Sequence, residues 1–296
     1  MNPTALAPSL DDEVVPETAA FYRHALQALG DAQVPFLVGG AFAHACFTGI
    51  RRSTKDLDLF IKRSDWDRIS QLMRSHGWRC EMTFPHWLAK VYAGEDFIDL
   101  IFNSGNGVTP VDDRWFRSNA QADVLGVPVR LANIEDSLTS KAFIMERERF
   151  DGADVAHLIQ ANAERIDWRG LVDRFGANWR VLLSHMTMFG FIYPGERHRI
   201  PNWVMETLIA RLAADTRQPP LEDLRVCQGT LISREQYLHD LESLGYLDGR
   251  LTPASTMTAE DIAVWTDAIP ARQEPTPEAP PAVMNTVSVT GLVDLA

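Results

Sequence analysis

Two aspartates separated by one leucine are the residues of this chain whose spacing points most directly to chemistry. Asp56 and Asp58 lie in the stretch KDLDLF, between a basic loop and an apolar run. In a β-strand, residues i and i+2 point to the same face, so these carboxylates would project side by side while Leu57 and Leu59 enter the core. Adjacent carboxylates repel each other unless a cation lies between them, and hard oxygen ligands suit Mg²⁺. The pair therefore predicts a divalent-cation site.

A glycine turn stands upstream of this pair. The sequence FLVGGAFAHACF places an apolar strand before Gly39 and Gly40, and a short helix after them. The N-terminus of a helix offers unpaired N–H groups that bind anions such as phosphate. A cation site beside a phosphate site indicates phosphoryl or nucleotidyl transfer.

A third carboxylate fits the same site. Asp99 lies in EDFIDLIFN, residues 95–103, where both faces of the expected strand are mostly apolar. A buried charge needs a partner or a metal ion. If this strand pairs beside the strand of Asp56 and Asp58, three carboxylates meet, and such clusters hold two Mg²⁺ ions in in-line displacement reactions. The alternative is a half-exposed strand with solvated carboxylates.

The charge around the site differs from that of the whole chain. The formal net charge of the 296 residues is −12, which argues against a general nucleic-acid-binding surface, since such surfaces are usually basic. The interval from Arg51 to Arg63 nevertheless holds five basic residues. We expect Arg52, Thr54 and Lys55 of this interval to contact a triphosphate. The alternative is an ordinary solvated loop.

Taken together, these residues resemble the DNA polymerase β-like nucleotidyltransferase superfamily. The superfamily pattern is a hydrophobic residue with Gly-Gly or Gly-Ser, a spacer, Asp-h-Asp-h, and a later Asp on a neighbouring strand (h, hydrophobic). Here these elements are Val38-Gly39-Gly40, Asp56-Leu57-Asp58-Leu59 and Asp99. The stretch GIRRSTKDLDLFI is similar to small stand-alone bacterial members, some of them toxin-like. The resemblance covers roughly residues 34–160, and the spacer 41–55 is longer than in antibiotic-modifying members.

The resemblance implies further roles. In related enzymes a lysine on the helix after the core sheet approaches the triphosphate, and Lys141 is the matching position; the alternative is a lysine whose stem lies along the core. Asp151 and Asp154 match a further stretch of these relatives, but helix-start caps are the favoured interpretation. Asp56, Asp58 and Asp99 would hold two Mg²⁺ ions, for which Mn²⁺ can substitute. Asp99 would also help to deprotonate an acceptor hydroxyl.

The elements that must position these residues follow from apolar periodicity. We expect helix 16–30, strand 35–39, helix 40–48, strand 56–61, a helix from Ser64 to about His76, and strands 79–84, 87–93, 97–102 and 124–132. Helices are expected over 134–149, 152–163, 168–175, 178–191, 201–214 and 232–245. The fold class is therefore α/β (α+β), a mixed-sheet nucleotidyltransferase core followed by an all-helical C-terminal region. The expected domains are 1–132, 133–268 and a disordered tail, 269–296, rich in Pro, Glu, Thr and Ala.

Other features exclude several classes of protein. The three cysteines, Cys46, Cys80 and Cys227, are far apart and form no CxxC motif, so a disulfide framework is not expected. The histidines form no HExxH motif, which argues against zinc, and a core or surface position is favoured for His44 over one facing the site. No secretion signal or membrane span is apparent, which favours a cytoplasmic protein.

The sequence thus predicts an enzyme that transfers NMP from an NTP, such as ATP, to a hydroxyl acceptor and releases pyrophosphate. The acceptor stays open among tRNA, another RNA, a protein and a small molecule. The alternative is a non-catalytic nucleotide-binding or partner-binding module, such as one half of a toxin–antitoxin pair, which would bind a protein partner through the helical half.

Overall fold

The N-terminal half of the protein is built on one mixed sheet. The computed structural model describes residues 14–219, 225–251 and 255–269, so the expected tail beyond residue 269 lies outside the described residues. The strands of the main sheet are β1 (Leu37–Val38), β2 (Leu57–Phe60), β3 (Arg79–Phe84), β4 (Leu88–Ala93) and β5 (Asp96–Ile101). Their order is β1-β2-β5-β4-β3, with β2 and β5 parallel and all other neighbours antiparallel. The expected mixed, antiparallel-leaning sheet is confirmed.

The pairing of β2 with β5 brings the aspartates together. Asp58 and Asp99 are direct register partners in this parallel pair. Leu57 and Leu59 are fully buried in the main core, so alternation along β2 turns Asp58 and Phe60 to the opposite face. That second face carries its own small apolar cluster around Phe60 and Trp115. The carboxylates therefore lie between two layers of core.

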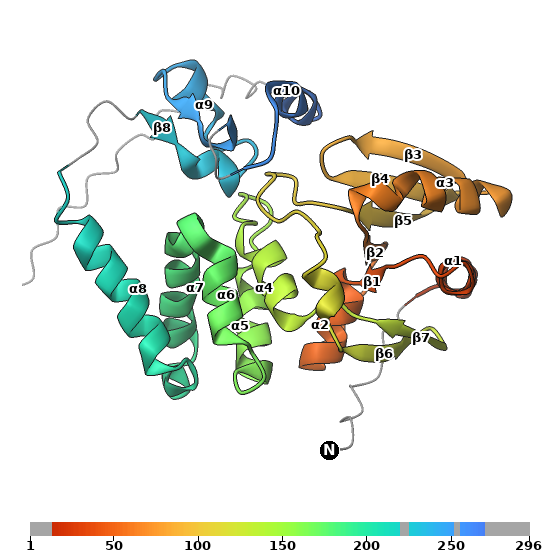
Figure 1. Cartoon of the computed structure of the whole chain (residues 1–296), viewed down its shortest axis with the longest axis horizontal. Helices are drawn as coiled ribbons and strands as arrows, with labels where there is room; N and C mark the ends of the chain where they lie inside the picture. The colour runs from red at the N-terminus through yellow and green to blue at the C-terminus, as the bar shows by residue number, and fades with distance from the viewer. Residues whose placement is uncertain (1–13, 220–224, 252–254, 270–296) are drawn as a thin grey trace, which may run out of the picture.

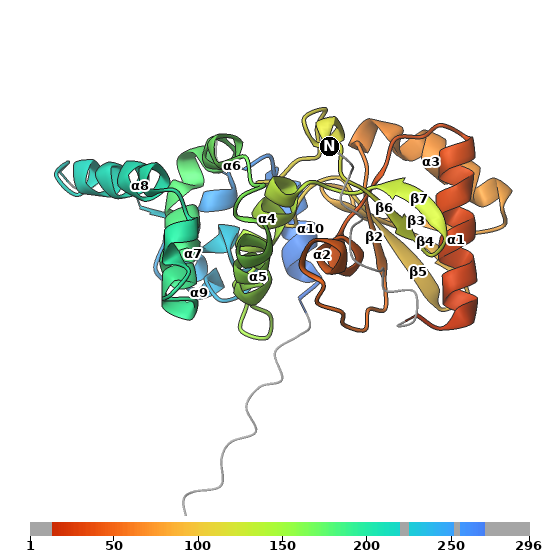
Figure 2. The ribbon, with the colours of Figure 1, turned by 90° about the horizontal axis from the view of Figure 1, so that it is seen from below.

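Three helices accompany the sheet. They are α1 (Pro16–Asp31), α2 (Gly40–Thr48) and α3 (Trp66–Ser75). All three contribute apolar side chains to the same main core as β2 and β5. In Figure 2, α1 and α3 lie at the outer side of the sheet, and α2 lies between the sheet and the helical half of the molecule.

The helical half follows a small hairpin. Where one strand over 124–132 was expected, the structure has β6 (Gln121–Val124) and β7 (Val127–Arg130), an antiparallel pair. The turn at Leu125 and Gly126 takes positive φ at both residues, 55° and 77°, which folds the segment back on itself. The helices are α4 (Ile134–Ala142), α5 (Gly152–Asn162), α6 (Trp168–Phe175), α7 (Trp179–Ile192) and α8 (Asn202–Asp215). Figure 1 shows α8 at the far end from the sheet.

One expected helix is shorter than its sequence pattern suggested. The helix over 134–149 ends at Ala142, and residues 143–151 form a tight loop closed by a bridge between Met145 and Phe150. The loop is held by Glu146, whose carboxylate accepts hydrogen bonds from Ser233 and from the backbone N–H of Arg234. Partners distant in sequence therefore override the local helical periodicity.

The C-terminal segment returns across the molecule. The helix expected over 232–245 is wrong in extent: only α9 (Leu238–Glu242) forms, beside the parallel pair β8 (Val226–Cys227) and β9 (Leu247–Asp248). A final helix, α10 (Ala259–Asp267), packs against β3 (Figure 1). Its Trp265 contacts Phe84 and Trp87 edge to face, with ring centroids 4.7 and 5.3 Å away. This segment thus bridges the helical half and the sheet.

Within the described ranges, no helix combines the length and the apolar character that crossing a bilayer requires. Cys46, Cys80 and Cys227 all lie within the described residues and are not joined in disulfides, and Cys46 is buried.

Candidate active site

Three carboxylates meet at the start of β2 and in the middle of β5. Ligand oxygens of Asp56, Asp58 and Asp99 all lie within 4.8 Å of one another. Asp56 comes directly before the strand, where the hydroxyl of Thr54 donates to its Oδ1 at 2.8 Å. Thr54 is therefore a partner of a carboxylate, in addition to being an expected nucleotide contact. The expected clustering of the three aspartates is present.

Asp58 lies at the centre of this cluster. Burial, with the charges of Asp56 and Asp99 adding to it, raises the pKa of Asp58 from 3.8 to about 7. A carboxylate in such surroundings is stabilised by a cation.

Gly40 allows Asp58 to lie against the first turn of α2. Gly40 has φ +53°, and a Cβ built on it would lie 1.7 Å from Oδ2 of Asp58. A Cβ on Gly39 would strike the ring of Phe60 at 2.2 Å. The glycines are therefore required first by the carboxylate and the ring of β2. Phosphate access, for which the sequence suggested them, stays a prediction for the same turn.

Asp99 has a partner that the sequence interpretation overlooked. Nζ of Lys90, on the neighbouring strand β4, donates to Oδ1 of Asp99 at 2.6 Å. Burial raises the pKa of Asp99, and the ion pair with Lys90 partly offsets that rise. A lysine inside the otherwise apolar strand LAKVYA was the available signal in the sequence.

Two of the three cations proposed for the triphosphate, Arg52 and Lys141, meet at one buried aspartate. Arg52 binds Asp154 through both terminal nitrogens, at 2.9 and 2.7 Å, and Nζ of Lys141 lies 2.5 Å from Asp154 Oδ2. Although burial opposes it, these cations lower the pKa of Asp154 to about 2. Asp154 is thus the shared anion of Arg52 and Lys141, and its side chain makes no helix cap, contrary to the interpretation from the sequence.

Asp151 also differs from a capping residue. It is the residue before α5, but its side chain makes no capping hydrogen bond. It pairs with Arg149 at 3.0 Å and lies 3.4 Å from Lys141. Lys141 is therefore surrounded by two carboxylates in the wall of the site, and only 9% of its side chain is exposed.

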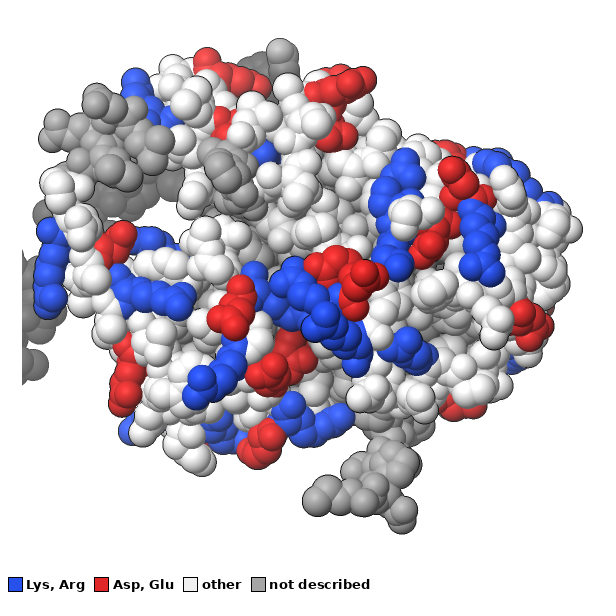
Figure 3. Space-filling model, in the orientation of Figure 1, with Lys and Arg blue, Asp and Glu red and all other residues white. Residues whose placement is uncertain are grey.

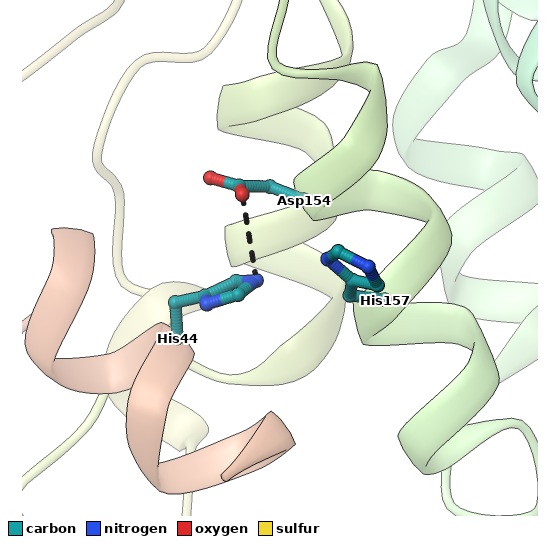
Figure 4. A group of neighbouring side chains, drawn as sticks. All are labelled: His44, Asp154 and His157. Atoms are coloured by element: carbon teal, nitrogen blue, oxygen red, sulfur yellow. Dashed lines mark ion pairs between the residues drawn. The ribbon is translucent and has the colours of Figure 1, made fainter. Parts of the chain in front are cut away.

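His44, on α2, and His157, on α5, lie beside Asp154 (Figure 4). Nε2 of His44 is 3.6 Å from Asp154 Oδ1, and ligand atoms of the three residues lie within 4.8 Å of one another. Burial lowers the pKa of His44 to about 4, so its ring is neutral. Because Arg52 and Lys141 already neutralise Asp154, a divalent ion would add charge to a positive environment. The group does not fit a second metal centre. His44 was expected in the core or at the surface; it is buried and still borders the site.

A cavity of about 630 Å³ connects these groups. Its lining includes Gly40, the three clustered aspartates, Arg52, Thr54, His44 and Lys141. Of the predicted nucleotide contacts, Gly39 and Lys55 do not line it. Its other wall comes from residues that the sequence interpretation missed because they are distant in sequence: Trp87, Asn103 to Asn106, Thr230 to Glu235, and Trp265.

The residues of the aspartate cluster fit a divalent cation. Three oxygen ligands of high negative charge converge in a cavity, and burial together with the charges of its two neighbours raises the pKa of the central one, Asp58. Oxygen-rich sites of this kind suit Mg²⁺ or Mn²⁺. Asp56 and Asp99 each give one oxygen to a protein donor, which leaves the remaining oxygens for a metal.

One face of the molecule carries charges of both signs. On the face shown in Figure 3, basic and acidic side chains of the described residues alternate across the middle of the molecule. This agrees with the net charge of −12 and contrasts with the large positive surface typical of proteins that bind nucleic acid along its length.

Comparison with known proteins identifies the family. The sequence profile of an uncharacterised nucleotidyltransferase family matches residues 24–184, more than half of the chain. No curated protein matches this sequence.

Several solved structures are similar at low identity. The lincomycin-bound lincosamide antibiotic adenylyltransferase LnuA has 15% identity and a TM-score of 0.36, over 50% of this chain and 99% of its own. The antibiotic-resistance factor ANT(2'')-Ia has 14% identity and a TM-score of 0.37, over 58% and 98%. An antigenic nucleotidyltransferase-like protein from Paracoccidioides brasiliensis has 13% identity and a TM-score of 0.39, over 66% and 94%. These scores are too low to carry an argument about substrate.

The matched residues 24–184 contain the glycine turn, the three aspartates and Lys141, the features on which the resemblance to the polymerase β-like superfamily was based. The chain belongs to the uncharacterised nucleotidyltransferase family, and it is an enzyme of the nucleotidyltransferase class.

Proposed function

We infer that this protein transfers NMP from an NTP to a hydroxyl acceptor in a reaction that depends on Mg²⁺. The single observation that carries this proposal is the cluster of Asp56, Asp58 and Asp99, whose ligand oxygens lie within 4.8 Å of one another in a cavity. Family membership narrows the chemistry to nucleotidyl transfer.

The acidic and the basic side chains of the cavity have different roles. Asp56, Asp58 and Asp99 hold the metal, which when bound would neutralise the triphosphate and the charge that develops at the reacting phosphorus. Arg52 and Lys141, which line the same cavity, supply positive charge there, and Asp154 fixes them. The first turn of α2, beginning at Gly40, presents backbone N–H groups to the phosphates. Catalysis would then come mainly from positioning and charge stabilisation.

The bond changes follow from this arrangement. The acceptor oxygen forms a bond to the α-phosphorus, and the bond from that phosphorus to the bridging oxygen breaks, so pyrophosphate leaves. The proton of the acceptor hydroxyl passes to a base at the cluster, for which Asp99 is the candidate. Trp87 and Trp265, on the wall farther along the cavity, are candidates to contact the acceptor or the nucleobase.

The test is transfer of label. Full-length protein is incubated with α-labelled ATP, GTP, CTP or UTP, Mg²⁺ and a cell extract, and the RNA, protein and small-molecule fractions are counted. Label in one fraction, lost in the Asp58→Asn variant and on chelation of metal, supports the proposal and identifies the acceptor class. Nucleotide binding without any transfer would contradict it and favour a non-catalytic module.

A further inference from the structure

Lys90 is a cation built into the aspartate cluster. It is the antiparallel register partner of Asp99, and its Nζ lies 2.6 Å from Asp99 Oδ1. Side-chain exposure is 18% for Lys90 and 13% for Asp99, so water screens the pair only weakly. The ammonium is therefore a strong local charge beside the expected metal ligands.

A second contact fixes the lysine. Its Nζ lies 3.8 Å from the ring centroid of Phe97, which precedes Asp99 by two residues and so shares its face of β5. A cation over an aromatic face is attracted by the ring quadrupole. With the carboxylate on one side and the ring on another, the ammonium has little freedom to swing away when a metal arrives.

The other cations of the cavity are arranged differently. Lys141 and Arg52 are bound to Asp154, and Arg149 is bound to Asp151. Lys90 instead contacts a member of the three-aspartate cluster directly. Lys141 and Arg149 also stabilise the charged form of Asp58 electrostatically, but their ion pairs are with Asp154 and Asp151, whereas the ion pair of Lys90 is with a carboxylate of the cluster itself.

The charge balance has a consequence for metal binding. The three carboxylates carry three negative charges when ionised, and Lys90 cancels one of them, which leaves the charge that one divalent ion neutralises. Lys90 also occupies one oxygen of Asp99. We propose that Lys90 is a positioning residue that restricts the nucleotide-free cluster to a single divalent ion, so that a second ion enters only together with the triphosphate.

This inference rests on the proposed metal-dependent function and adds an order of events to it. The metal-bound triphosphate brings its own negative charge, which offsets the repulsion between Lys90 and a second cation. Loading of the second metal would therefore report that nucleotide is present. Without Lys90 the cluster would take up metal more strongly in the absence of substrate.

The experiment measures Mn²⁺ binding to full-length, nucleotide-free protein by paramagnetic resonance and calorimetry. Wild type, Lys90→Met, Lys90→Gln and Lys90→Arg are compared. Lys62→Met serves as the control, because Lys62 pairs with the exposed Asp113. We expect one Mn²⁺ in wild type, Lys90→Arg and Lys62→Met. Lys90→Met and Lys90→Gln should bind Mn²⁺ at least about tenfold more tightly or take up a second ion, because a like charge has been removed.

Thermal denaturation separates this role from a purely structural one. A lysine that only joins β4 to β5 would lower the melting temperature on removal without changing Mn²⁺ affinity. We expect instead that Lys90→Met melts lower than wild type without metal and gains more from added Mn²⁺. Equal Mn²⁺ affinity and stoichiometry in wild type and in both neutral variants overturns the proposal for Lys90 alone. Failure of wild type to bind Mn²⁺, even with NTP, overturns the metal-dependent function as well.

Discussion

A Cβ atom on Gly40 would lie 1.7 Å from Oδ2 of Asp58. The first residue of α2 and the central carboxylate of β2 are thus in contact, and the side chain of one depends on the absence of a side chain on the other. This contact joins the glycine turn to the aspartate pair, two motifs that are separated in the sequence by the rest of α2 and the loop after it.

The first prediction tests this contact with two alanine substitutions in the same helix region. Gly40→Ala must displace Asp58, whereas Gly49→Ala, at the other end of α2, meets no atom within 4 Å. Both glycines have positive φ, +53° and +73°, so both variants carry backbone strain of about 1 kcal/mol. We expect Gly49→Ala to lose only that stability and to keep metal binding. Gly40→Ala should lose more and also lose transfer activity and Mn²⁺ affinity.

The measurements are chemical denaturation and Mn²⁺ calorimetry on the same preparations. Normal Mn²⁺ affinity in Gly40→Ala would show that Asp58 tolerates displacement and would remove the proposed reason for glycine at this position.

The second prediction concerns Asp58 and pH in the presence of a chelator. The pKa of Asp58 is about 7 in the folded protein and near 3.8 when unfolded. The folded state therefore binds the proton more tightly, and the cost of the charged form is absent below pH 4 and fully present above pH 7. The free energy of unfolding of metal-free wild type should therefore decrease as the pH rises from 4 to 7. Asp58→Asn should remove this part of the decrease and be more stable than wild type at pH 8 by on the order of 1–3 kcal/mol.

The same substitution should abolish nucleotidyl transfer, because a neutral amide cannot balance the charge of a bound metal. Denaturation of both proteins at pH 5 and pH 8, with and without Mn²⁺, provides the comparison. A variant that is less stable than wild type at pH 8 without metal, or that retains near-normal turnover, would refute the account of Asp58.

The sequence predicted the aspartate cluster better than the residues that surround it in the cavity. Asp56 and Asp58 could be placed side by side because strand alternation is a local property, whereas Asp99 joined them only on the condition that its strand pairs beside theirs. The pairing of Lys90 with Asp99 was missed because it depends on the register between β4 and β5. That register is set by the turn between the strands and by packing, and neither is visible in a spacing rule.

Distant contacts explain the errors in the second half. The apolar period predicted a helix through residue 149, but Glu146 binds Ser233 and Arg234, and the chain leaves the helix after Ala142. The same contact holds the segment over which a helix at 232–245 was expected. Tertiary hydrogen bonds therefore outweighed propensity in two segments at once, and together these segments form the far wall of the cavity.

The third prediction concerns Asp154. Its carboxylate is 5% exposed and binds both Arg52 and Lys141. Removing the charge of a buried ionic partner leaves Lys141 with only its longer contact to Asp151, so Asp154→Asn should cost about 3 kcal/mol. The pKa of Asp154 is lowered to about 2, so its contribution is present above pH 4 and is lost as the pH falls toward 2. The variant should therefore show a weaker loss of stability in acid than wild type.

A matched comparison is Asp215→Asn, because Asp215 also pairs with an arginine, Arg180, but at an exposed site. Exposed pairs contribute about 0–1 kcal/mol, so little change is expected there. The measurement is urea denaturation from pH 2.5 to pH 7, combined with NTP binding at pH 7. Equal effects of the two substitutions would show that Asp154 does not organise the cations of the site.

The last prediction concerns the cavity wall supplied by α10. Trp265 contacts Phe84 and Trp87, and the guanidinium of Arg234 lies 4.4 Å from the centroid of its ring. Trp265→Ala should open the cavity at this wall and destabilise the protein by about 1–3 kcal/mol, since aromatic contacts and buried area are lost. The aspartate cluster lies on other elements, so Mn²⁺ affinity should stay within about twofold of wild type. The neighbouring Val264, which is 40% exposed, provides the control Val264→Ala, for which neither stability nor binding should change.

Calorimetric titrations of the Trp265→Ala variant with Mn²⁺ and then with each NTP show which substrate Trp265 contacts. Weakened NTP binding would assign Trp265 to the nucleotide, whereas unchanged NTP binding with reduced transfer would assign it to the acceptor. Unchanged transfer and unchanged NTP binding would show that α10 covers the site without contacting either substrate.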